Sequence, residues 1–168
     1  MREYLPAMTP SRAIDWKWAR LDALSPRDVY EMLALRERVF IVEQNCPYQD
    51  ADGRDAEAWH LLGWDSEGAA KKLIGYARVF EPGARYKEPS IGRIVSAPEV
   101  RGSGVGRIIV NEAMRRCAEL WPKQTIRIAA QRSLEQFYRE FGFVVDGAPY
   151  MEDGIEHIDM LWGGGETK

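Results

Sequence analysis

The sequence has few of the residues that would point to a disulfide framework or to a membrane segment. It contains two cysteines and two histidines in 168 residues. Two thiols do not make a disulfide framework, which fits a reducing compartment. No apolar run approaches the roughly 18 residues that cross a bilayer, and the first dozen residues lack the apolar core of a secretion signal. We therefore expect a cytoplasmic protein with no membrane partner.

The sequence also lacks a run of positive charge, because its 23 lysines and arginines are scattered along the chain. The formal net charge is -3 at pH 7, and 45% of the residues are hydrophobic, as in ordinary globular proteins. The lack of a basic run argues against a nucleic-acid partner. The length suits one well-buried domain over residues 1–168, with loose tails expected at 1–12 and 163–168.

Apolar periodicity divides the chain into alternating strands and helices. Residues 13–21 alternate as a strand does, and residues 25–44 show helical spacing behind Ser25 as N-cap and Pro26 at the first helical position. Further strands are expected at 59–65, 72–80, 90–98, 125–130 and twice within 143–162, with helices from 105 to about 120 and over 134–142. This order predicts an α/β (α+β) fold, a mixed sheet of about six or seven strands with helices on both faces.

A glycine-rich stretch precedes the second long helix. The segment PEVRGSGVGRIIV places Gly102, Gly104 and Gly106 directly before the expected helix. The free amides of a helix's first turn, with a dipole worth roughly half a positive charge, attract anions. Glycines leave these amides accessible, and Arg101 adds a cation that can fork onto phosphate oxygens. The stretch therefore predicts an anion site, with a tight turn that binds nothing as the alternative.

Two nucleotide-binding motifs are excluded at this stretch. The dinucleotide fingerprint needs a third glycine where this chain has Arg107, and the P-loop needs a Lys-Ser/Thr pair that is missing. What remains is Arg-x-x-Gly-x-Gly, formed by Arg101, Gly104 and Gly106. This pattern resembles the pyrophosphate-binding motif of the GCN5-related N-acetyltransferase (GNAT) superfamily, whose members bind acetyl-coenzyme A (acetyl-CoA).

A second segment carries the same resemblance. QRSLEQFYREFGF is similar to the family's second cofactor segment, with Tyr138, Gly142 and Phe143 in a Tyr-x-x-x-Gly-Phe pattern, and Gln131 where many members have asparagine. The order of elements also agrees over nearly the whole chain. Segments such as LRERVFIVEQNCPYQDADGRD and YMEDGIEHIDM resemble the ElaA-type branch of the superfamily. That resemblance names a relative without naming an acceptor.

The resemblance implies a GNAT-type fold with acetyl-CoA as cofactor. A bulge in the fourth strand, at residues 94–96, would free backbone amides for the thioester carbonyl and the pantetheine arm. Tyr138 would be the acid for the leaving thiolate, although by itself it would be read as a packed aromatic. The residues implied to hold the cofactor are Ile94, Val95, Ser96, Arg101, Gly102, Ser103, Gly104, Val105, Gly106, Arg107, Gln131, Phe137 and Tyr138.

The base that would deprotonate the acceptor amine stays open. An alkylammonium group has a reference pKa near 10.4 and must lose a proton before it attacks. Glu43 follows an apolar helical run, which could raise its pKa, although a solvated helix-end carboxylate fits equally well. His60 and His157 lie in strands with apolar neighbours, where a structural role is the alternative. A water relay could replace all three.

Several polar residues are candidates for the acceptor side of the site. The residues expected to contact the acceptor are Arg36, Glu43, Asp52, Arg93 and His157. Either arginine could anchor a carboxylate or be salt-bridged instead. The loop DADGRDAE could attract a cationic amine or be a solvated turn, and it lacks the glycine and glutamate of a calcium loop, so no metal is expected. Cys46 shows no matching base, and Cys117 is expected to be packed and inert.

The sequence as a whole predicts a direct acetyl-CoA-dependent N-acetyltransferase that acts on an amine of a small molecule or a peptide. One alternative enzyme uses another acyl donor or an acceptor oxygen. A second alternative is a module that binds or senses acyl-CoA and catalyses nothing. Exposed tryptophans or an edge strand could support a homodimer.

Overall fold

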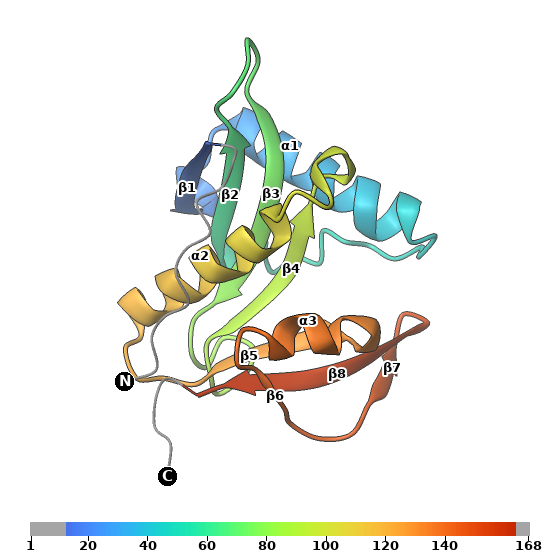
Figure 1. Cartoon of the computed structure of the whole chain (residues 1–168). Coiled ribbons are helices and arrows are strands. Elements are labelled where there is room, and N and C mark those ends of the chain that lie inside the picture. The colour runs from blue at the N-terminus through green and yellow to red at the C-terminus, as the bar shows by residue number, and fades with distance from the viewer. Residues whose placement is uncertain (1–12, 164–168) are drawn as a thin grey trace.

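A mixed β-sheet runs through the molecule, and helices cover both of its faces (Figure 1). The structure is a computed structural model that describes residues 13–163, so the tails expected to be loose lie outside the described residues, apart from Gly163. The strands are β1 (Ile14–Arg20), β2 (Trp59–Asp65), β3 (Lys72–Phe80), β4 (Ser90–Ser96), β5 (Ile126–Gln131), β6 (Val144–Val145), β7 (Tyr150–Glu152) and β8 (Ile155–Trp162). The main helical segments are α1 (Pro26–Arg36), η2 (Glu37–Glu43), α2 (Val105–Leu120) and α3 (Glu135–Arg139).

The strands pair in the order β1-β2-β3-β4-β5-β8-β6, and β7 pairs with β8 beside this path. Neighbouring strands are antiparallel except β4 and β5, which run parallel. The prediction of a mixed sheet with helices on both faces is confirmed. Within residues 13–163 the sheet has eight strands, more than expected, because residues 143–162 contain three strands where two were expected.

The first helix begins with a capping box. Ser25 Oγ accepts a hydrogen bond from Asp28 N at 3.1 Å, and Asp28 Oδ2 accepts one from Ser25 N at 2.9 Å. Pro26 occupies the first helical position, where a missing N–H costs no hydrogen bond. The helix expected over residues 25–44 changes character after Arg36, because η2 is π-helical. Such turns are frequent at functional sites, and η2 contributes to the cavity described below.

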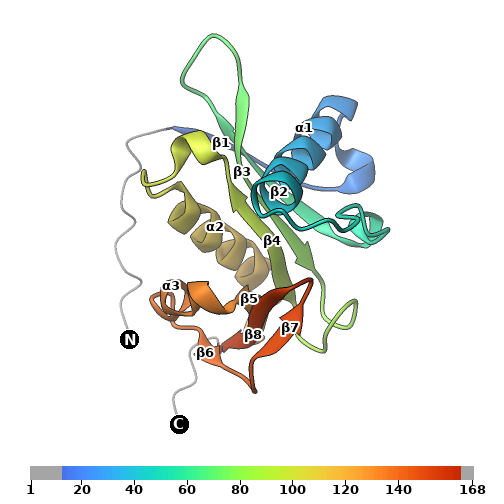
Figure 2. The same ribbon diagram turned by 90° about the vertical axis from the view of Figure 1, so that its right-hand side faces the viewer.

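Helix α2 presents an apolar stripe to the sheet. Val105, Ile109, Ala113 and Cys117 are all buried, as their spacing of four predicts. Gly75 on β3 lets the helix approach closely, because a Cβ there would lie 2.5 Å from Ile109 Cδ1. Across residues 13–163, no helix is long and apolar enough to cross a membrane. Helices α2 and α3 lie on one face of the sheet and α1 on the other (Figure 2). Helix α2 packs against both β3 and β4.

A bulge interrupts β4 at the centre of the sheet. Tyr76 pairs with Val95 and Arg78 pairs with Gly92, so the two residues 93 and 94 lie opposite Ala77 alone. Strand β4 pairs with β5 earlier along its length, at residues 90 and 91. A bulge leaves its extra residue unpaired and bends the strand. A bulge was implied for residues 94–96; the structure has it at residues 93 and 94, while Val95 and Ser96 pair regularly with β3.

Candidate active site

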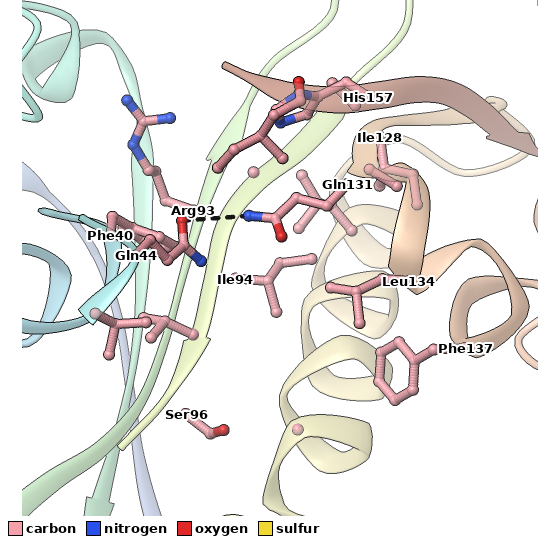
Figure 3. Close-up of a pocket in the computed structure, with 18 of the residues that line it drawn as sticks. Phe40, Gln44, Arg93, Ile94, Ser96, Ile128, Gln131, Leu134, Phe137 and His157 are labelled. Atoms are coloured by element: carbon pink, nitrogen blue, oxygen red, sulfur yellow. Dashed lines mark hydrogen bonds between the residues drawn. The ribbon is translucent and has the colours of Figure 1, made fainter. Parts of the chain in front are cut away.

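A cavity of about 1190 Å³ opens beside the bulge of β4. Its walls come from η2, β4, the start of α2, the end of β5, α3 and the β7–β8 turn (Figure 3). Every residue implied to hold the cofactor lines this one cavity, although the residues come from segments between 94 and 138 of the chain. Glu43, Asp52, Arg93 and His157 line it as well, whereas Arg36 and His60 do not.

The start of α2 offers bare backbone to the cavity. Gly104 is the N-cap residue and has a φ of 85°, in the left-handed region that favours glycine. A Cβ built on Gly106 would meet nothing within 4 Å, and its φ is not in that region. The first amides of an α-helix have no partner within the helix and bind anions readily. The turn therefore fits a diphosphate group, which side chains at these glycines would obstruct.

Arg101 lies at this turn and has an acidic partner from another element. Its Nη1 is 2.6 Å from Glu43 Oε1 of η2, and both side chains are more than 40% exposed. An exposed ion pair of this kind contributes only about 0–1 kcal/mol, whereas bidentate contacts between arginine and phosphate are stronger. Arg101 is therefore able to exchange Glu43 for a bound phosphate.

Tyr138 lies in the aromatic wall of the cavity. Its ring makes edge contacts with Phe137 at 5.1 Å and with Phe143 at 6.1 Å between ring centroids. The side chain is buried, and burial raises the pKa of its hydroxyl above the ordinary value of 10.0. The hydroxyl consequently remains protonated at neutral pH and can donate a hydrogen bond.

Arg93 occupies the bulge in a strained backbone conformation. Its φ is 50°, where a residue with a Cβ costs roughly 1–2 kcal/mol. Its Nε donates to Asp50 Oδ1 at 2.8 Å, and its guanidinium lies over the rings of Phe40 and Tyr48, at 5.9 and 5.5 Å from their centroids. The bulge is therefore held by a side chain as well as by its strand neighbours.

Two glutamines meet across the cavity. Gln131 Nε2 at the end of β5 donates to Gln44 Oε1 just after η2, at 3.4 Å (Figure 3). The sequence analysis did not single out Gln44, and the available signal was its place directly after Glu43 at the end of an apolar helical run. The contact joins the two walls between which β4 runs (Figure 3).

His157 presents one free ring nitrogen near this contact. Gln131 and His157 are cross-strand partners on β5 and β8. His157 Nδ1 lies 2.8 Å from the carbonyl oxygen of Ile155, which can only accept, so the proton of the neutral ring belongs on Nδ1. Nε2 then carries a lone pair, and its nearest acidic oxygen, Glu152 Oε2, is 3.9 Å away.

His60 is not at the cavity, which removes it from the candidate bases. Its side chain is fully buried, and both ring nitrogens are engaged, with Tyr76 Oη at 2.7 Å and the carbonyl oxygen of Asp55 at 2.8 Å. Burial is the main cause that lowers the pKa of His60 below 6.5. The histidine is therefore a neutral structural residue, as the alternative reading of the sequence held.

Arg36 is likewise withdrawn from the acceptor site by burial. It is 0% exposed and donates to Asp50 Oδ2 at 2.7 Å and to Asp55 Oδ1 at 2.8 Å. Arg78 contacts Asp55 too, and it binds both carboxylate oxygens of Asp52 at 2.8 Å. Asp50 and Asp55 of the acidic loop consequently belong to a buried ion network, whereas Asp52 and Glu57 keep exposed positions.

The aspartates of the acidic loop thus form salt bridges with arginines. Burial opposes ionisation of Asp52, but the hydrogen bonds and charge of Arg78 outweigh it and hold the pKa of that carboxyl well below its usual value. Among residues 13–163, no group of three or more His, Cys, Asp or Glu side chains is arranged to hold a metal ion. Asp52 still lines the cavity, but Arg78 already neutralises its charge.

The two cysteines differ in their surroundings. Cys46 lines the cavity, is buried, and donates from Sγ to the carbonyl oxygen of Asp153 at 3.1 Å. Cys117 lies in the packed stripe of α2, where burial raises the pKa of its thiol to about 12. A thiol with so high a pKa carries almost no thiolate at neutral pH, so Cys117 is inert as expected.

The fold is the one found in acyl-CoA N-acyltransferases. A crystal structure of such an enzyme from Pseudomonas aeruginosa superposes with a TM-score of 0.82 at 34% identity, over 89% of this chain and 99% of that one. The crystal structure of Escherichia coli ElaA gives a TM-score of 0.80 at 36% identity, with the same coverage of 89% and 99%.

Sequence comparison assigns the family. Residues 35–163 match the model of the acetyltransferase (GNAT) domain. A UPF0039 protein of Synechocystis sp. is 44% identical over 149 residues, covering 89% of this chain and 95% of that protein. ElaA of E. coli is 38% identical over 149 residues, covering 88% and 95%. The chain belongs to the GNAT acetyltransferase family and is similar to its ElaA and UPF0039 proteins, as the resemblance in its sequence implied.

Proposed function

We propose that this protein transfers an acetyl group directly from acetyl-CoA to an amine of a small molecule or a peptide. The observation that carries the proposal is one cavity shared by the bare start of α2 and the bulge of β4. When bound, acetyl-CoA supplies an acyl group on a good leaving sulfur. The C–S bond of the thioester breaks, a C–N bond to the neutral amine forms, and the proton that the nitrogen then loses passes to the departing sulfur, so that coenzyme A leaves as the thiol.

Backbone groups of this chain would hold the donor at its two ends. The amides of Gly102 and of residues 104–106 would bind the diphosphate, with Arg101 as their charged partner, while the amide of Ser103 donates to the carbonyl oxygen of Val100. The bulge at Arg93 and Ile94 would give amides to the pantetheine arm and the thioester carbonyl. Donors aimed at a developing oxyanion can lower a barrier by about 3–4 kcal/mol. These two elements would therefore fix the carbonyl and polarise it.

Tyr138 would assist the departing sulfur. A phenol whose pKa lies above 10 is a weaker acid than a thiol with a reference pKa of about 8.5. Its contribution is therefore a hydrogen bond to the sulfur as negative charge develops there. A hydrogen bond to a charged group is worth about 1.5–3 kcal/mol.

His157 is the proposed base for the amine. Its Nε2 is the free nitrogen of the ring and belongs to a residue that lines the cavity. Glu43, the other titratable candidate at the cavity, pairs with Arg101 until a phosphate displaces it, so the preference for His157 rests on its free ring nitrogen. A neutral imidazole can take the proton of an incoming ammonium group, directly or through one water.

The test is thiol release from acetyl-CoA in the presence of pooled amines. We expect steady release that depends on both the protein and an amine, and a product that carries the acetyl group on nitrogen. Parallel reactions with longer acyl-CoA donors measure which acyl chain is preferred. If the protein binds acetyl-CoA but none of the amines causes thiol release, the protein is the acyl-CoA sensor and not an enzyme.

A further inference from the structure

The bulge of β4 is built around a residue that does not favour its own backbone conformation. Arg93 has a φ of 50°, and together with Ile94 it lies opposite the single residue Ala77 of β3. Such conformations persist where the surrounding structure enforces them. A glycine would adopt the same conformation without strain. The side chain of Arg93 must therefore contribute something that glycine could not.

That side chain is tied down at its polar end. Arg93 Nε donates to Asp50 Oδ1 at 2.8 Å, and the guanidinium lies over the rings of Phe40 and Tyr48. Asp50 is buried and does not line the cavity, whereas Arg93 does. The contact thus joins the cavity wall to a residue in the interior.

Asp50 is itself fixed by α1. The fully buried Arg36 donates from Nε to Asp50 Oδ2 at 2.7 Å and from Nη2 to the carbonyl oxygen of Asp50 at 3.0 Å. Arg36 also donates to Asp55 at 2.8 Å, which holds the guanidinium from a second side. Asp50 cannot follow Arg93 without breaking these buried bonds. A continuous chain of contacts therefore runs from α1 through Asp50 to the bulge.

We propose that Asp50 and Arg93 form a tether that holds the β4 bulge in the shape that receives the pantetheine arm and the thioester. This inference rests on the proposed function. Both are positioning residues, since they act through the backbone amides of the bulge. Arg93 is accordingly assigned to the bulge instead of to a carboxylate of the acceptor, because its Nε donates to Asp50 and its Nη2 lies 3.8 Å from Asp52 Oδ2.

The test compares two ligands that differ in the pantetheine arm. Acetyl-CoA spans the whole site, whereas 3′-phospho-ADP has only the nucleotide half and does not reach the bulge. In Asp50→Asn, one amide oxygen must serve two arginines, and the fully buried Arg36 loses more by giving it up. We expect calorimetric affinity for acetyl-CoA to fall about tenfold and kcat to fall with it. Affinity for 3′-phospho-ADP stays within twofold of wild type.

Arg93→Gly separates the tether from the backbone strain. Glycine accepts the left-handed conformation but cannot hold Asp50, so we expect the same loss of acetyl-CoA affinity with 3′-phospho-ADP binding retained. This variant also decides the matter if Asp50→Asn does not fold. Glu57→Gln is the matched control, since Glu57 belongs to the same acidic segment but pairs with Arg54 at the surface, and it should change neither affinity.

Three outcomes overturn the inference, and they can be told apart. Unchanged acetyl-CoA affinity and kcat in Arg93→Gly contradict the tether and leave the proposed function standing. A wild-type protein that binds 3′-phospho-ADP no less tightly than acetyl-CoA gains nothing from the arm, and this also contradicts the tether. Wild-type protein that binds neither ligand contradicts the proposed function, and the tether falls with it.

Discussion

At the scale of single residues, the chemistry depends on which polar groups reach the cavity and which are buried elsewhere. The chain has two histidines, and the structure places them in opposite surroundings. His60 has both nitrogens bonded in the interior, while His157 keeps Nε2 free beside the cavity. The sequence showed the same strand setting for both. Only the three-dimensional partners, a tyrosine hydroxyl and two carbonyl oxygens, separate them.

Tyr138→Phe is expected to slow acyl transfer without weakening acetyl-CoA binding. The variant loses one hydrogen bond to the developing sulfur charge and keeps the aromatic packing with Phe137 and Phe143. A loss of about 1.5–3 kcal/mol corresponds to a fall in kcat of about 10- to 100-fold. Thiol release measures kcat and calorimetry measures affinity. An unchanged kcat would show that Tyr138 only packs in the core.

His157→Gln is expected to lower kcat about 100-fold or more at neutral pH, because a general base contributes at least about that factor. Activity should recover as the pH rises toward the pKa of the amine, near 10.4, where the amine no longer needs a base.

Glu43→Gln is the matched variant. It frees Arg101, so we expect acetyl-CoA affinity to rise about two- to fivefold with kcat retained. The reverse pattern, with kcat lost in Glu43→Gln alone, would make Glu43 the base.

At the scale of elements, two short segments form the proposed donor site. The start of α2 was predictable because glycine spacing and a following apolar stripe are visible in the sequence. The bulge of β4 was implied by family resemblance and could not be derived from periodicity. A glycine often marks such a bulge in a sequence, whereas here an arginine adopts the left-handed conformation. The π-helical turn η2 was missed because its apolar positions continue the helical spacing of α1. Local sequence sets the elements, whereas these irregularities depend on tertiary partners.

Gly106→Val is the cleanest test of the start of α2. A side chain there enters open space without backbone strain, and valine forms helix somewhat better than glycine. We expect acetyl-CoA affinity to fall at least tenfold while the melting temperature is retained or rises slightly. Gly104→Val should also weaken binding at least tenfold, but its φ of 85° adds strain, so its melting temperature should fall. Unchanged acetyl-CoA affinity in Gly106→Val would show that the diphosphate does not bind at this turn.

At the scale of the whole molecule, a buried ion network connects α1, the acidic loop and the central strands. The sequence left a salt bridge open for Arg36 as an alternative to an acceptor contact, but it did not indicate that the partner carboxylates come from the acidic loop. Arg36 and Arg78 are almost fully buried, and each has carboxylate partners within 2.9 Å. Breaking one partner of a buried pair leaves an uncompensated charge and is strongly destabilising. The network therefore gives the cavity wall a rigid base.

His60 makes the stability of this interior depend on pH. Its pKa is lowered in the folded protein, so below about pH 6.5 the unfolded chain binds a proton that the folded chain does not. The free energy of unfolding should then fall by up to about 1.4 kcal/mol per pH unit, from pH 6.5 down to the lower folded pKa. In His60→Gln, denaturant titrations at several pH values should show a shallower slope in this window. Equal slopes would mean that His60 is not neutral in the fold.

The central claim is that the start of α2 and the bulge of β4 together hold an acyl-CoA. A crystal structure of the protein with coenzyme A tests it most directly. We expect the diphosphate against the amides of residues 102–106 and the pantetheine arm along the bulge at Arg93 and Ile94. Coenzyme A bound elsewhere, or a turn at 102–106 that makes no contact with the diphosphate, would contradict the account.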